Sequence, residues 1–71
     1  MQRFWVVPLN NNGEQSADAV PVQKSGYFSP ERTRHHVERA FVNGKVRLDG
    51  EVYDTIESAL SAYDALSAQL D

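Results

Sequence analysis

The chain has 71 residues, no cysteine and a formal net charge of −3, with 41% hydrophobic and 24% charged residues. This length excludes a second domain, the absence of cysteine excludes disulfides and thiolate zinc sites, and the balanced composition argues against disorder throughout. Because no apolar run is long enough for a membrane span or the core of a signal peptide, we expect a single small cytoplasmic domain over residues 1–71.

Residues 3–9 are predicted to form a β-strand, because they are rich in β-branched and aromatic side chains. Alternation along a strand divides the apolar side chains between two faces, Trp5, Val7 and Leu9 on one and Phe4 and Val6 on the other. Both faces are thus apolar, whereas a strand with one solvated face carries a polar residue at every second position. We therefore expect other groups to cover both faces of this strand.

Two prolines bear on the positions of the strands within the sheet. Residues 19–23 are predicted to form a short second strand after a polar loop, with Val20 and Val22 facing inward. Pro21 cannot donate a hydrogen bond to a neighbouring strand, which predicts an edge position for this segment. By the same reasoning, Pro8 predicts an edge position or a strand end for the first strand.

The segment of residues 31–42 is compatible with two structures. Ser29-Pro30-Glu31 is a helix entry signal, since serine caps, proline fits the first turn and an acid is favourable near the positive end of the helix dipole. A helix would end at a left-handed Gly44 and would have one apolar face, formed by Thr33, Val37, Ala40 and Phe41. Alternatively, the segment is a strand in a hairpin through Asn43-Gly44. The entry signal and the apolar spacing together favour the helix.

Residues 45–53 show the clearest strand pattern in the chain. Alternation places Val46, Leu48 and Val52 on one face, and Tyr53 with the charged residues of the segment on the other. Within this segment, Asp49-Gly50 is a dipeptide that can break a strand into a turn or a bulge.

A C-terminal helix is predicted from about residue 55 to about residue 69. Residues 54–57 resemble a capping box in which Asp54 takes the cap position. At about 100° per residue, the apolar side chains of this helix form one stripe, Ile56, Ala59, Leu60, Tyr63, Leu66 and Leu70. The whole pattern predicts an α+β fold with a small antiparallel sheet of three or four strands, a middle helix and this C-terminal helix.

Residue patterns typical of catalysis or metal binding are absent from the sequence. His35 and His36 are adjacent, so on a helix they point about 100° apart and cannot bind one metal ion together. No nucleophile elbow surrounds any serine, and the 4 glycines are scattered rather than grouped in a phosphate-binding loop. We therefore expect a protein without enzymatic activity, cofactor or metal.

The charges are unevenly distributed along the chain. Residues 23–47 contain six Lys and Arg residues against two Glu, whereas residues 48–71 contain six Asp and Glu residues and no Lys or Arg. On a helix, three of the basic side chains share the face opposite the apolar one and could contact phosphates or an acidic protein: Arg32, His35 and Arg39. One alternative is that these cations only keep the outer face of the helix hydrated. Another is that they pair with the acidic C-terminal helix. Three cations are also few for phosphate-driven affinity.

The leading hypothesis is a small non-enzymatic protein-interaction module, an adaptor, regulator or inhibitor of the kind common among accessory and phage-borne genes. A domain of this size is marginally stable, which favours association with a protein partner or with a second copy as a homodimer. Helices on one side of the sheet leave one apolar face of the first strand uncovered, with Trp5 or Phe4 as the aromatic anchor of an interface.

The alternative hypothesis is a nucleic-acid-binding protein that uses the basic segment 32–39. The position of the acidic C-terminal helix distinguishes the two hypotheses. If that helix packs beside the basic segment, its carboxylates disfavour phosphate binding; if it lies on the far side, the basic surface suits nucleic acid.

Overall fold

A computed structural model describes residues 1–24 and 30–71, with side chains described for residues 1–24 and 34–71. Along the chain the elements are β1 (Phe4–Leu9), β2 (Val20–Val22), α1 (Pro30–Ala40), η1 (Phe41–Asn43), β3 (Lys45–Leu48), β4 (Glu51–Tyr53) and α2 (Ile56–Ser67). The predicted α+β fold is therefore confirmed, with an antiparallel sheet, a C-terminal helix and a shorter middle helix. The capping serine predicted at Ser29 lies outside the described residues.

The four strands form one antiparallel sheet in the order β2-β1-β3-β4. The edge position predicted from Pro21 is confirmed, but the first strand is an inner strand and Pro8 lies near its end. The carbonyl of Pro8 accepts a hydrogen bond from the Ser16 N–H at 2.9 Å. Because the N and C=O of one residue point to the same side in an antiparallel strand, the missing N–H of Pro8 removes no bond to β3.

The connection between β3 and β4 is a two-residue turn with positive φ at both positions, 50° at Asp49 and 85° at Gly50. Such a turn fits the right-handed twist of a hairpin. It reverses the alternation, so that Tyr53 pairs with Val46 and packs against the core, while Val52 is 48% exposed. The prediction that Val52 shares a face with Val46 and Leu48, and Tyr53 lies on the other, was wrong, because it continued the alternation of a single strand through the turn.

Residues 30–40 form a helix, so the strand alternative for this segment is wrong. Gly44 ends the helical segment in the left-handed conformation with φ 97°, and its N–H donates to the Phe41 carbonyl at 2.9 Å. The Asn43-Gly44 dipeptide therefore closes a helix and leads directly into β3 rather than forming a hairpin turn.

Helix α2 begins one residue later than the capping-box pattern indicates. Thr55 is the N-cap, and its Oγ1 accepts a hydrogen bond from the Ser58 N–H at 3.3 Å. The prediction of Asp54 at the cap was wrong by one position, because Thr55 has the extended backbone that a cap requires, with φ −129° and ψ 147°.

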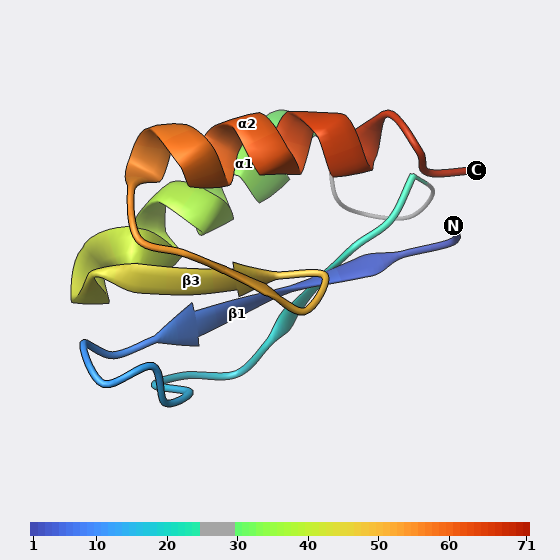
Figure 1. Cartoon of the computed structure of the whole chain (residues 1–71). Helices are drawn as coiled ribbons and strands as arrows, with labels where there is room; N and C mark the ends of the chain where they lie inside the picture. Colours follow the sequence, from blue (N-terminus) through green and yellow to red (C-terminus); the bar gives the residue numbers. More distant parts are fainter. Residues whose placement is uncertain (25–29) are drawn as a thin grey trace.

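Both helices lie on the same side of the sheet (Figure 1). Between the helices and the sheet lies the core, formed by Phe4, Val6, Val22, Val37, Val46, Leu48, Ala59 and Tyr63. The rings of Phe4 and Tyr63 meet edge to face with their centroids 5.8 Å apart. The stripe predicted for the C-terminal helix is confirmed, since Ala59 and Tyr63 are buried and the leucines of the stripe pack against the core.

Candidate functional site

The side of the sheet that faces away from the helices is the first candidate site. Paired residues on adjacent strands share a face of a sheet, so the register assigns each strand residue to one side. We call this side the open face; its strand positions are Trp5, Val7, Leu9, Pro21, Lys45, Arg47 and Val52. The expectation that helices cover only one face of β1 is confirmed.

The open face carries solvent-exposed apolar side chains. Trp5 is 45% exposed and pairs with Pro21, and Val52, in the edge strand β4 on the same face, is 48% exposed. Val7 lies between them and is only half-buried. The prediction that both faces of β1 are covered is therefore wrong for Trp5 within the described part of the chain. An exposed tryptophan beside other apolar groups is typical of a binding surface.

Positive charge is interleaved with these apolar groups. Lys45 and Arg47 are the only charged residues at the described strand positions of the open face, and both are half-buried. Neither cation forms an ion pair with any residue that the structure describes. Arg3, which directly precedes β1, is exposed and is a third cation near this face. The described strand positions of the open face are thus apolar and basic, and none of them carries a carboxylate.

The two aromatic residues proposed as anchors have opposite environments. Phe4 is 1% exposed and packs on Tyr63 in the core, so it is not available to a partner. Trp5 is available. The sequence could not distinguish them, because both faces of β1 are apolar and only the packing of the helices decides which face is buried.

The basic helix packs beside the acidic one. One guanidinium nitrogen of Arg34, on α1, donates to both carboxylate oxygens of Asp64, on α2, at 3.1 and 3.2 Å. This is the arrangement expected to disfavour phosphate binding by α1. His35 and Arg39 are exposed, and the side chain of Arg32 lies outside the described residues. The sequence did not single out Arg34, since its partner lies thirty residues further along the chain.

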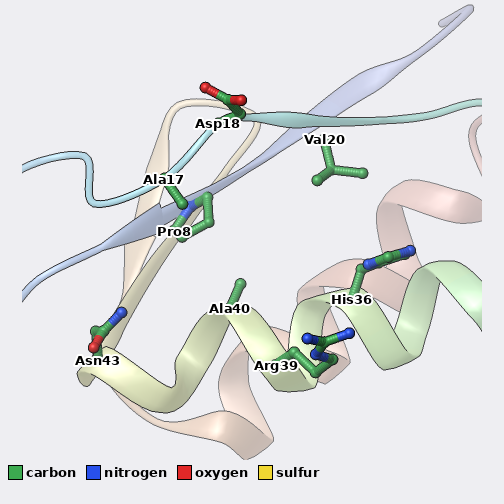
Figure 2. Close-up of a pocket in the computed structure, with 8 residues that line it drawn as sticks. All are labelled: Pro8, Ala17, Asp18, Val20, His36, Arg39, Ala40 and Asn43. Atoms are coloured by element: carbon green, nitrogen blue, oxygen red, sulfur yellow. The ribbon is translucent and has the colours of Figure 1, made fainter.

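A cleft of about 310 Å³ between α1 and the β1–β2 side of the sheet is the second candidate site (Figure 2). Its residues come from β1, β2, α1, η1 and the loop before β2: Pro8, Ala17, Asp18, Val20, His36, Arg39, Ala40 and Asn43. Of these, only Arg39 was predicted as a site residue. The others escaped prediction because they come from separate segments that only the fold brings together.

The described residues give no sign of a metal centre. Within residues 1–24 and 30–71, no group of three or more His, Cys, Asp or Glu side chains is placed to hold a metal ion. None of the helices in this part of the chain combines the length and the apolar character needed to cross a membrane. Comparisons with models of known protein families, with curated proteins and with solved structures found no match for this chain.

Proposed function

We propose that this protein is a non-enzymatic interaction module that binds another protein through the open face of its sheet. The observation that carries this proposal is the exposed Trp5, set among apolar strand positions on the side that the helices leave uncovered. Tryptophan and arginine are enriched among the hot-spot residues that contribute most of the binding energy at protein interfaces. The open face contains one of each, Trp5 and Arg47.

The charges of the open face define the chemistry of the partner. Arg47 lies in one cross-strand row between Val7 and Val52. A partner that buries these valines also removes water from the guanidinium, which is costly unless a carboxylate replaces that water. The partner surface therefore has an apolar centre with at least one acidic group opposite Arg47.

The same charges favour a different protein over a second copy of the chain. Two open faces related by a two-fold axis would bring Lys45 and Arg47 of both copies together, and no carboxylate at the described strand positions would neutralise them. Like charges that face each other across an interface weaken it. A homodimer through this face is thus the less favourable occupant.

Nucleic acid is also a poorer match to the open face than a protein is. Single-stranded DNA and RNA bind surfaces on which several aromatic rings stack successive bases. Trp5 is the only aromatic residue at a described strand position of this face, and its neighbours Val7, Pro21 and Val52 are aliphatic. The net charge of −3 also opposes phosphate binding.

The test compares the wild type with Trp5→Ser and Arg47→Glu in quantitative affinity capture from cells that express the protein. Val42→Ser is the matched control, because Val42 is 81% exposed in η1, away from the open face. We expect at least one protein that the wild type and Val42→Ser retain and that both open-face variants lose. With that protein purified, each open-face substitution should weaken binding at least about tenfold.

Three results would overturn the proposal. Equal capture by the wild type and the open-face variants would place the interface elsewhere. A nuclease-sensitive interaction, with tight binding to a single-stranded oligonucleotide, would establish the nucleic-acid alternative. A dimer that forms with rising concentration in sedimentation experiments, and that Trp5→Ser abolishes, would identify a second copy as the occupant.

A further inference from the structure

We infer that the cleft between α1 and the β1–β2 side of the sheet is a separate binding site for a carboxylate attached to a compact apolar group. This inference does not depend on the docking role of the open face, because the cleft lies on the helix side of the sheet (Figure 2). Its volume of about 310 Å³ is near the lower limit for ligand sites and admits a single ring with a short substituent.

Two facing walls of the cleft carry apolar side chains. Ala40 points from α1 toward Pro8 and Ala17 on the opposite wall, and Val20 also points into the space between them (Figure 2). These four side chains offer carbon surface on two sides of the cleft. A ligand body in contact with them would therefore be apolar.

Arg39 supplies the charge that selects a carboxylate. It lies in the last turn of α1 and is exposed, and it forms no ion pair with any residue in the described part of the chain. Its guanidinium presents a planar set of donors that matches the two oxygens of a carboxylate. The amide of Asn43, which also lines the cleft, donates one N–H to the Ser16 Oγ at 3.5 Å and has a second N–H as a further donor.

Asp18 is the one carboxylate among the residues that line this cleft. It does not occupy the place of the ligand, because its carboxylate points away from α1 (Figure 2). No ion pair joins Asp18 to Arg39 within the described residues. Among the described residues, no carboxylate therefore neutralises the guanidinium of Arg39 at the helix wall of the cleft.

A carboxylate of this kind occurs in two classes of ligand, a small free organic acid and the C-terminus of a peptide that ends in an apolar residue. Sodium benzoate represents the first source. The peptide acetyl-Gly-Gly-Phe represents the second, with its C-terminal amide as the uncharged control. Tighter binding of benzoate would identify a small acid as the ligand class, and tighter binding of the peptide acid would identify a chain terminus.

The experiment is a titration of the isotope-labelled full chain, followed through amide chemical shifts. We expect saturable shifts confined to residues 17–20 and 36–43, with a dissociation constant on the order of 1 mM for a ligand as small as benzoate. Arg39→Gln should weaken binding about tenfold, as expected for loss of a charged hydrogen bond. Lys24→Gln, which removes an exposed cation outside the cleft, should leave binding unchanged.

A second variant tests whether the ligand occupies the volume of the cleft, independently of the charge of Arg39. Ala17 is exposed, so Ala17→Leu fills the cleft without disturbing the core and should abolish binding. The inference is wrong if neither benzoate nor the peptide acid gives saturable shifts in the wild type. It is also wrong if Arg39→Gln binds as the wild type does, or if the peptide amide binds as tightly as the acid.

Discussion

Phe4 and Trp5 are adjacent in the sequence and opposite in environment. Phe4 lies in the core against Tyr63, and Trp5 is about half exposed on the open face. The alternation of β1 separates them, and the two helices cover only the Phe4 side. At the scale of single residues, Phe4 thus contributes to stability and Trp5 remains available to a partner.

Tyr63→Ala tests the assignment of the core. Tyr63 is buried and meets Phe4 edge to face, so its loss leaves a large cavity and should destabilise the protein by about 3–5 kcal/mol in urea unfolding. Ser61→Ala, on the exposed side of the same helix, should change stability by less than about 0.5 kcal/mol. Equal effects of the two substitutions would mean that α2 is packed on its other side.

At the scale of elements, most of the fold could be predicted, because the signals for each element are local. The proline in β2, the left-handed glycine after the middle helix and the apolar stripe of α2 all predicted what the structure contains. The face of Val52 could not be predicted, because it depends on whether Asp49-Gly50 makes a bulge or a two-residue turn. A shift of one residue in the alternation moves every later side chain of the strand to the opposite face of the sheet.

The candidate sites were less predictable than the elements. The apolar character of both faces of β1 indicates an interface and makes Trp5 one of two candidate anchors. The sequence does not identify Arg47, because its place beside Val7 and Val52 depends on the pairing of three strands. It does not identify the cleft residues other than Arg39 either, because they are distant in sequence.

The junction of η1 and β3 permits a test at the scale of elements. Gly44 has φ 97°, and a β-carbon there would lie 2.6 Å from the Asn11 Oδ1. Asn11 is exposed, so its side chain can rotate away from the added carbon. We therefore expect Gly44→Ala to lower the free energy of unfolding by about 1–2 kcal/mol, mainly because alanine disfavours the left-handed backbone.

Gly50→Ala is the control for this substitution, since Gly50 has φ 85° and no atom near the added carbon. A similar loss for the two variants in urea unfolding would support this explanation. A much larger loss for Gly44→Ala would mean that the contact with Asn11 dominates, and no loss at all would mean that position 44 is not left-handed.

At the scale of the whole molecule, most basic residues of the segment 23–47 lie in two places, on α1 and on the open face. Lys45 and Arg47 lie on the open face, while the acidic α2 lies on the opposite side of the sheet. Part of the charge of α1 is neutralised by the ion pair of Arg34 with Asp64, an exposed pair that contributes less than about 1 kcal/mol to stability. The strand positions of the open face therefore carry a positive charge, which would attract an acidic partner.

The fluorescence of Trp5 tests the central claim most directly, because it is the only tryptophan in the chain and lies on the open face. In the free monomer, acrylamide should quench Trp5 readily, and the emission should lie at the long wavelengths of a hydrated indole. Addition of the captured partner should shift the emission to shorter wavelengths and protect Trp5 from the quencher. A free protein that sediments as a monomer and whose Trp5 is already protected would contradict the claim, because the chain itself would then cover the open face.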